Sequence, residues 1–165
     1  MSKSIEDLKA AFAGESQANR KYLAFAEKAE KEGYPQVARL FRAAAAAETV
    51  HAHAHLRAMD GVGTTAENLK AAIAGESYEF VSMYPEFIKD AEAEDNKRAL
   101  TSFKYAMAVE KEHEQLYQEA YEKMGQPGDE YDYYICPVCG HTHPRSAPDK
   151  CPVCGVPGSA FLRVS

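Results

Sequence analysis

The feature that most constrains the fold of this chain is an internal repeat. The tetrapeptide Ala-Gly-Glu-Ser occurs at residues 13–16 and again at residues 74–77. A Glu-x-x-His motif follows each copy, opening at Glu48 after Glu15 in the first half and at Glu110 after Glu76 in the second. The two intervals differ by a single position. Each half of the chain therefore offers one glutamate and then one Glu-x-x-His, which predicts a duplicated pair of helices.

The residues around both copies have the composition of long amphipathic helices, being rich in Ala, Glu, Lys and Leu. Proline suits the first turn of a helix and glycine its end, so Pro35 and the glycines mark helix boundaries. Pro85 falls inside a helical stretch, where proline removes a hydrogen bond, and predicts a kink there. The breaks fit four helices, over residues 4–33, 35–61, 65–95 and 96–125.

The two Glu-x-x-His motifs can each present an oxygen and a nitrogen on one side of a helix, because positions i and i+3 share a face. Four-helix bundles build di-iron or di-manganese sites from one Glu on each of two helices and one Glu-x-x-His on each of the others. We therefore predict an all-α, ferritin-like four-helix bundle in which the Glu-x-x-His glutamates bridge two metals. Each histidine caps one metal and the other glutamates are terminal ligands. The six ligands are Glu15, Glu48, His51, Glu76, Glu110 and His113.

A single Glu-x-x-His arises easily by chance on the solvated face of a Glu-rich helix, but two at matched offsets favour a metal site. The repeat has one asymmetry, since Glu79 follows Glu76 by one turn where the first half has Ala18. We hypothesise that Glu79 competes with a histidine for one metal as its charge changes, because an extra anion suits ferric iron better than ferrous. Glu112, between Glu110 and His113, is expected to point into solvent.

The second motif is a pair of identical Cys-Pro-Val-Cys-Gly units that hold all the cysteines. Four thiolates in a tetrahedron select iron or zinc, and the glycine after each second cysteine permits a tight turn. Ligand type leaves zinc, for a structural ribbon, and iron, for a one-electron carrier, both open. His141 and His143, between the units, are expected at the surface. The four ligands are Cys136, Cys139, Cys151 and Cys154.

The turn-forming residues 125–130 read as a linker, so we predict a bundle domain over residues 1–128 and a cysteine domain over residues 129–165. The second domain has too few apolar residues for a core of its own and needs a metal to hold it together.

Charge and hydropathy argue against several classes of partner and cellular location. The net charge is −6 with scattered basic residues, which argues against nucleic acid. The N-terminus lacks the pattern of a signal peptide, and no stretch approaches the roughly 18 apolar residues that cross a bilayer. We therefore expect a cytoplasmic protein without a membrane span, in which paired cysteines bind metal rather than form disulfides.

Taken together, these motifs resemble the rubrerythrins, a family that joins a ferritin-like di-iron bundle to a C-terminal rubredoxin-like domain. The resemblance covers essentially the whole chain, and the family's pattern falls on the six bundle ligands, on Glu79 and on the four cysteines. It implies two irons in the bundle and one iron in the cysteine site. It also implies that Tyr22 and Tyr84 lie beside the di-iron ligands and hydrogen-bond to them, as further catalytic residues.

The resemblance implies a peroxidase of oxidative-stress defence that reduces hydrogen peroxide to water. Its electrons would pass through the cysteine-bound iron from rubredoxin or an NAD(P)H-dependent reductase, because the sequence has no dinucleotide fingerprint. A homodimer is implied, arranged head to tail so that one subunit's cysteine site serves the partner's bundle. Two other functions stay open: a ferritin-like ferroxidase or iron-handling protein, and a non-enzymatic electron carrier.

Overall fold

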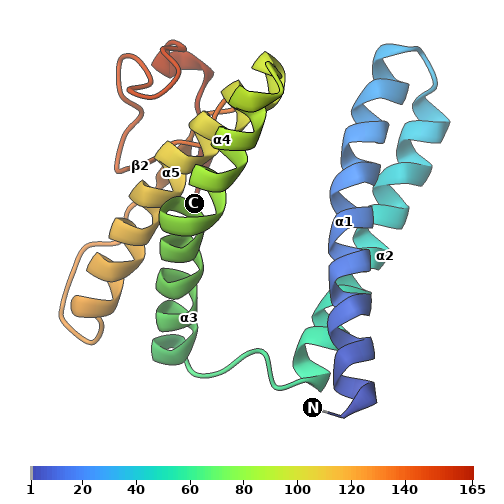
Figure 1. Ribbon diagram of the computed structural model, residues 1–165, viewed down its shortest axis with the longest axis horizontal. Coiled ribbons are helices and arrows are strands. Elements are labelled where there is room, and N and C mark those ends of the chain that lie inside the picture. The colour runs from blue at the N-terminus through green and yellow to red at the C-terminus, as the bar shows by residue number, and fades with distance from the viewer. Residues whose placement is uncertain (1) are drawn as a thin grey trace. The chain divides into compact units, whose positions relative to one another are not determined.

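The computed structural model describes residues 2–165, which are mostly helical (Figure 1). The chain divides into two compact units, the first ending at Gly63 and the second comprising Thr64–Ser165. Strands occur only near the C-terminus, around the four cysteines, in the part of the chain that the structure describes. This confirms the predicted combination of long helices with a small C-terminal β/loop region. Among the described residues, no helix combines the length and apolar character that crossing a membrane requires.

The first unit is a helical hairpin of α1 (Lys3–Lys31) and α2 (Pro35–Ala58), which lie side by side in Figure 1. Gly33, in the connecting turn, has φ +80, a conformation that glycine adopts without strain. The predicted starts of both helices are correct to within one residue, but α1 ends at Lys31 rather than Gly33 and α2 ends at Ala58 rather than Gly61. The hairpin's buried positions are small, which lets the two helices approach closely. They are Ala26 and Ala29 on α1 and, at every seventh position of α2, Ala38, Ala45 and Ala52.

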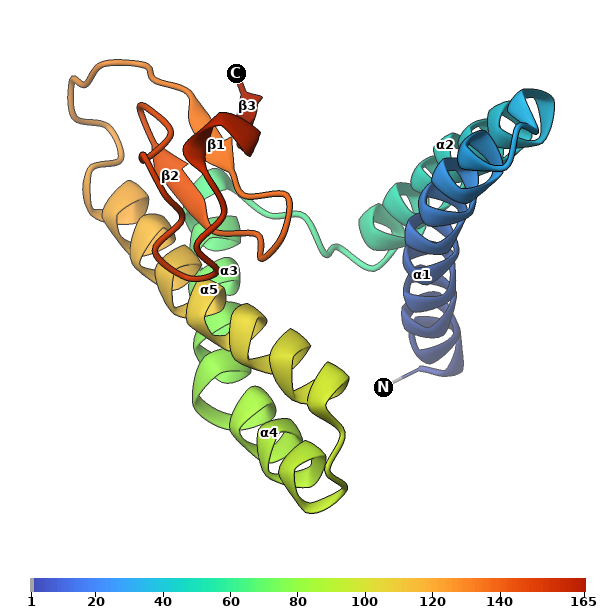
Figure 2. The ribbon, with the colours of Figure 1, turned by 90° about the horizontal axis from the view of Figure 1, so that it is seen from above.

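The second unit opens with a helix whose start is fixed by a capping box. The hydroxyl of Thr64 accepts a hydrogen bond from the Glu67 N–H, and the Glu67 carboxylate accepts one from the Thr64 N–H at 2.8 Å. Asn96 caps the last helix by accepting from the Ala99 N–H at 3.1 Å. Within this unit, the last helix packs against the two α-helices before it (Figure 2). The elements are α3 (Thr65–Tyr78), a π-helical segment η1 (Glu79–Met83), α4 (Tyr84–Ala93) and α5 (Lys97–Glu122).

The kink predicted at Pro85 takes the form of the π-helical segment η1, which ends just before Tyr84 and the proline. Proline has no N–H and its ring collides with the carbonyl of the preceding turn, so that turn must widen or bend. The chain stays helical through this segment, because α4 follows η1 directly.

The C-terminal part of this unit contains a three-stranded antiparallel sheet with strand order β2-β1-β3. Strand β2 contacts α5, so the sheet and the helices form one unit. Buried residues are few, namely two cysteines, one histidine and one glycine, which agrees with a metal as the main stabilising group. The elements are β1 (Tyr133–Ile135), β2 (Thr142–Pro144), the 3₁₀ turn η2 (Gly158–Ala160) and β3 (Leu162–Val164).

Candidate metal centres

The first unit brings together three of the predicted ligands, which we call the first half-site: Glu15, Glu48 and His51. Glu15 comes from α1 and the other two from α2, one helical turn apart. Their ligand atoms all lie within 4.8 Å of one another. His51 Nδ1 lies 2.9 Å from Glu48 Oε2, so these two atoms are close enough to bind the same ion.

The second unit repeats this geometry in the second half-site: Glu76, Glu110 and His113. Glu76 comes from α3 and the Glu-x-x-His pair from α5, and the three ligand atoms again lie within 4.8 Å of one another. His113 Nδ1 lies 2.9 Å from Glu110 Oε2, the same separation as in the first half-site. The sequence repeat is therefore also a repeat of side-chain geometry.

The hydrogen bonds of His113 show that the second half-site fits a cation. Its Nε2 lies 2.8 Å from Thr142 Oγ1, and the Thr142 hydroxyl itself donates to the Gly140 carbonyl at 3.2 Å. The hydroxyl therefore accepts from Nε2–H, which leaves Nδ1 as the nitrogen that faces the Glu110 carboxylate. In the neutral ring Nδ1 carries the lone pair, so Nδ1 and the Glu110 carboxylate can bind one metal ion from the same side.

Carboxylates crowd the second half-site. Burial, followed by the charge of Glu110, raises the pKa of Glu76. Burial and the charge of Glu76 likewise raise the pKa of Glu79, the seventh predicted ligand. Glu79 does not belong to the group of three atoms within 4.8 Å, but it lies close enough to feel Glu76 and His113. Bound cations would offset this excess of negative charge.

The two predicted tyrosines lie in matching aromatic clusters. Tyr22 packs against Phe41 with ring centroids 6.1 Å apart, and Tyr84 packs against Phe103 at 6.2 Å. Burial, followed by the charge of Glu110, raises the pKa of Tyr84, which places its hydroxyl near the second half-site. Within residues 2–165 neither hydroxyl donates to a carboxylate, so their hydrogen bonds to the ligands stay a prediction.

The four cysteines form a closed cluster, the cysteine site. The Sγ atoms of Cys136 and Cys154 are 3.5 Å apart, as are those of Cys139 and Cys151, and all four lie within 4.8 Å of one another. A tetrahedral ion with metal–sulfur bonds of about 2.3 Å needs sulfur–sulfur distances of about 3.8 Å. The predicted tetrahedral thiolate site is thus present in the fold.

Each Cys-Pro-Val-Cys-Gly unit forms the same turn, which we call a knuckle. In the first, the N–H of Gly140 donates to the carbonyl of Cys136 at 3.0 Å, and in the second Gly155 donates to Cys151 at 3.0 Å. These two glycines have φ +85 and +81, where an L side chain would strain the backbone. The predicted role of the glycines is therefore correct.

The protein environment shifts the pKa values of the thiols in the cysteine site in different directions. Burial raises the pKa of Cys139 well above its ordinary value. Burial acts on Cys151 in the same direction, but hydrogen bonds from the N–H groups of Cys154 and Val153 outweigh it and lower the pKa to about 6. A metal that binds here must displace the Cys139 proton, which couples its affinity to pH.

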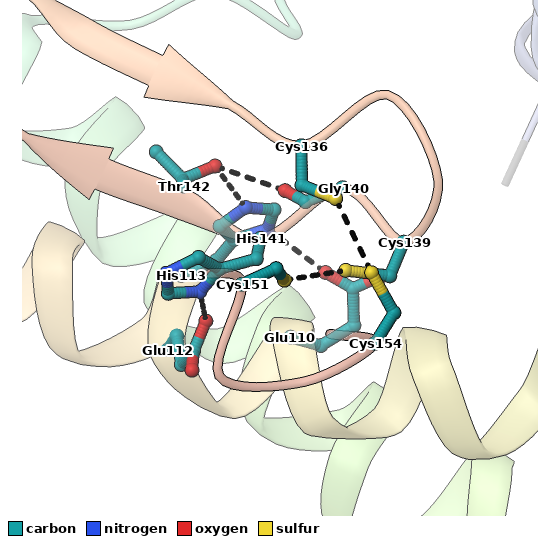
Figure 3. A network of polar contacts seen from close by, with 10 residues as sticks. All are labelled: Glu110, Glu112, His113, Cys136, Cys139, Gly140, His141, Thr142, Cys151 and Cys154. Atoms are coloured by element: carbon teal, nitrogen blue, oxygen red, sulfur yellow. Dashed lines mark hydrogen bonds and ion pairs between the residues drawn. The ribbon is translucent and has the colours of Figure 1, made fainter. Parts of the chain in front are cut away.

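Two surface predictions are wrong, and both concern the contact of the first knuckle with α5. His141 is only 6% exposed, and its Nδ1 contacts the Glu112 carboxylate, although both residues were expected in solvent (Figure 3). The reason is tertiary: the knuckle packs against α5 and covers the face that carries Glu112. Neither the spacing of the cysteines nor the helical pattern signals this docking.

Comparisons with known proteins agree with this geometry. Residues 6–121 match the family model for rubrerythrin, and residues 134–162 match the model for the rubredoxin-like domain of rubrerythrin. The chain is a rubrerythrin. Family membership gives this rubrerythrin its cofactors: a di-iron centre for the Glu and His clusters, and one iron, rather than zinc, for the four cysteines.

Individual relatives match over nearly the full length. Nigerythrin of Nitratidesulfovibrio vulgaris is 37% identical over 171 residues, covering 95% of this rubrerythrin and 84% of the relative. Rubrerythrin-2 of Clostridium acetobutylicum is 36% identical over 170 residues, covering 93% and 92% of the two chains. Among solved structures, the fully reduced, all-ferrous state of nigerythrin matches with a TM-score of 0.60 and 35% identity, covering 99% of this chain and 88% of that one.

Proposed function

We propose that this rubrerythrin is a peroxidase that reduces hydrogen peroxide to two water molecules, consuming two electrons and two protons, in defence against oxidative stress. The proposal takes both half-sites, together with Glu79, as the ligands of one di-iron centre. Glu48 and Glu110 of the Glu-x-x-His motifs, together with His51 and His113, would hold the two ions. When bound, two ferrous ions supply together the two electrons that cleavage of an O–O bond requires.

The observation that carries this proposal is the position of the cysteine site. Its first knuckle packs against α5, the helix that contributes Glu110 and His113. A cysteine-bound iron is a one-electron carrier. A peroxidase centre needs such a carrier, because it must be reduced again after each turnover. An iron-storage ferroxidase has no such requirement, so this arrangement favours the peroxidase over the ferritin-like alternative.

The chain's own residues handle protons. Burial and neighbouring carboxylates raise the pKa of Tyr84, so its hydroxyl holds a proton at neutral pH and can donate it to an oxygen of peroxide during reduction. Tyr22 is proposed for the equivalent role in the first unit. Electrons are proposed to come from rubredoxin or from an NAD(P)H-dependent reductase, and the chain is proposed to act as a homodimer.

The test is anaerobic stopped-flow mixing of the fully reduced, iron-loaded protein with hydrogen peroxide and, separately, with oxygen. We expect peroxide to oxidise the di-iron centre at least tenfold faster than oxygen at equal concentration. Equal rates with both oxidants would argue for the ferroxidase. No reaction of the bundle iron with either oxidant would leave only the electron carrier.

A further inference from the structure

Gly140, which ends the first knuckle, and the two residues after it lie on one face of α5. A Cβ added at Gly140 would be 3.8 Å from Val109 Cγ1, and the next residue, His141, contacts Glu112. Thr142 then meets His113 at 2.8 Å (Figure 3). Positions 109, 112 and 113 share a helix face, so the knuckle is docked in one register along α5.

This docking creates a hydrogen-bonded bridge from the cysteine site to a di-iron ligand. Gly140 is covalently joined to Cys139, and its carbonyl accepts from the Thr142 hydroxyl at 3.2 Å. The hydroxyl accepts in turn from His113 Nε2–H at 2.8 Å. The opposite nitrogen, Nδ1, is the one that faces Glu110. Two hydrogen bonds thus connect a cysteine ligand to the ring that holds the di-iron centre.

The bridge lies in apolar surroundings. His113 and Thr142 belong to the wall of a cavity of about 360 Å³ whose other lining is largely aliphatic and aromatic, including Leu69, Leu116 and Ile135. Hydrogen bonds are stronger in such a medium than in water. Among the described residues of its own unit, His51 has no partner for Nε2, so the bridge distinguishes the second half-site from the first.

We propose that Thr142 is a positioning residue that fixes the His113 ring and carries electronic coupling from the cysteine site to the di-iron centre that the same chain's His113 binds. The inference rests on the proposed function. In the step it serves, the cysteine-bound iron passes from ferrous to ferric while one ferric ion of the di-iron centre becomes ferrous, with no bond broken. A second such transfer, after the cysteine site is reduced again from outside, restores the reduced centre.

This assignment departs from the head-to-tail arrangement that the family resemblance implies. There the cysteine site of one subunit serves the bundle of its partner. Here the knuckle of a chain contacts the ligand helix of the same chain, so the relay and His113 belong to one polypeptide. Residues 123–132, between α5 and β1, bring the chain back along α5.

The first test follows electron transfer between the sites. Fully reduced protein is mixed anaerobically with one equivalent of peroxide, and the colour of the ferric cysteine site reports transfer after the bundle iron has been oxidised. We expect Thr142→Val to slow this second phase at least tenfold while the first phase changes less than twofold. Thr142→Ser, which keeps the hydroxyl, should stay within threefold of the wild type. Thr101→Val, which removes a hydroxyl from an exposed turn of α5, is the matched control.

Unchanged transfer in Thr142→Val would overturn the inference while leaving the peroxidase intact. If peroxide fails to oxidise the bundle iron at all, the proposed function is wrong. The hydrogen bond between Thr142 and His113 is then tested separately, on zinc-loaded protein. There, NMR of ¹⁵N-labelled histidines should show a slowly exchanging proton on His113 Nε2 that Thr142→Val loses and Thr142→Ser keeps. A fast-exchanging proton in the wild type would also overturn the inference.

A second test asks whether relay and ligand must share a chain. One chain carries Cys136→Ser and the other His113→Ala, and the two are co-expressed with different tags and purified through both. If each relay serves its own chain, the mixed protein has no complete pair and shows no transfer to the bundle iron. Transfer at about half the wild-type amplitude would show that the relay acts across chains and would overturn the assignment.

Discussion

The backbone N–H of Tyr84 donates a hydrogen bond to the carbonyl of Glu79, one position further back than an α-helix would use. The internal repeat explains this bond. Tyr84 is the counterpart of Tyr22, but it lies one position further from Glu76 than Tyr22 lies from Glu15. The second half therefore has one extra residue between its glutamate and its tyrosine, and the π-helical segment absorbs it.

Beyond this point the two halves stay in register. The ion pair of Arg42 with Glu30 at 2.9 Å recurs in the second half as Lys104 with Glu92 at 3.1 Å. Both members are displaced along the sequence by the same interval that separates Tyr84 from Tyr22. The π-helical segment thus keeps both the ligand before it and the packing after it in place. It also begins at Glu79, the carboxylate that has no counterpart in the first half.

The crowding of Glu79 predicts a pH-dependent stability for protein stripped of metal. Burial and the charge of Glu76 raise the pKa of Glu79 in the folded chain above its ordinary value of 4.5. The folded state therefore holds this proton more tightly, and its stabilising effect, full below about pH 4.5, is lost as pH rises through the folded-state pKa. Glu79→Gln should remove the loss and raise the free energy of unfolding at pH 7 by about 0.2–0.5 kcal/mol.

Chemical denaturation of stripped protein at pH 4 and pH 7 checks this expectation. The gain from Glu79→Gln should be present at pH 7 and absent at pH 4. Glu86→Gln, which neutralises an exposed carboxylate in the first turn of α4, is the control and should bring no gain at either pH. A gain of equal size at both pH values would mean that packing, not charge, separates Glu79→Gln from the wild type.

The electrostatics of Tyr84 predict a role in proton delivery. Burial and the charges of Glu110 and Glu79 raise its pKa, so the hydroxyl stays protonated at neutral pH. Tyr84→Phe keeps the ring that packs against Phe103 but removes the proton. We expect it to slow oxidation of the reduced centre by peroxide about 100-fold with iron content unchanged. Tyr78→Phe, at an exposed position on the preceding turn, should react at the wild-type rate in the same stopped-flow assay.

The sequence predicts what local geometry determines. The i, i+3 spacing on a helix brings a glutamate and a histidine together, so both Glu-x-x-His pairs are recognisable without a structure. The two cysteine knuckles follow from their spacing in the same way. The π-helical segment also had a signal, since the interval from the first glutamate to the motif is one position longer in the second half than in the first. Pro85 alone indicated a kink but not its form.

Tertiary docking is what the sequence leaves out. Thr142 is one of several polar residues after a cysteine knuckle, and no periodicity assigns it to His113. Glu112 and His141 are residue types typical of a protein surface, yet they contact each other because the knuckle packs against α5. The division of the chain after Gly63 is equally invisible in the repeat, which treats both helix pairs alike.

The two half-sites predict a shared loss of iron. If both contribute to one di-iron centre, removal of either bridging glutamate should release both bundle irons, because each ion depends on both bridges. Glu48→Ala and Glu110→Ala should then each lower the iron content from about three atoms per chain to about one, which stays in the cysteine site. Glu119→Ala, an exposed carboxylate on α5 paired with Lys123, is the control.

Metal analysis combined with the visible spectrum of the cysteine site checks this loss. A decrease of only one iron per chain in each variant would show that the half-sites bind metal separately. That outcome would contradict the di-iron assignment of the ligands while leaving the cysteine site untouched.

The cysteine domain should depend on its metal for order. Within its described residues, only Cys136, Cys151, His141 and Gly158 are buried, an apolar content far too small to offset the conformational entropy of folding. Cys139→Ser removes one thiolate and should abolish the visible spectrum, expose residues 133–164 to proteolysis and leave the helices intact by circular dichroism. Val138→Ala changes the exposed side chain next to that cysteine and should have neither effect. Protease resistance of the stripped Cys139→Ser chain would mean that packing against α5, rather than the metal, holds this domain together.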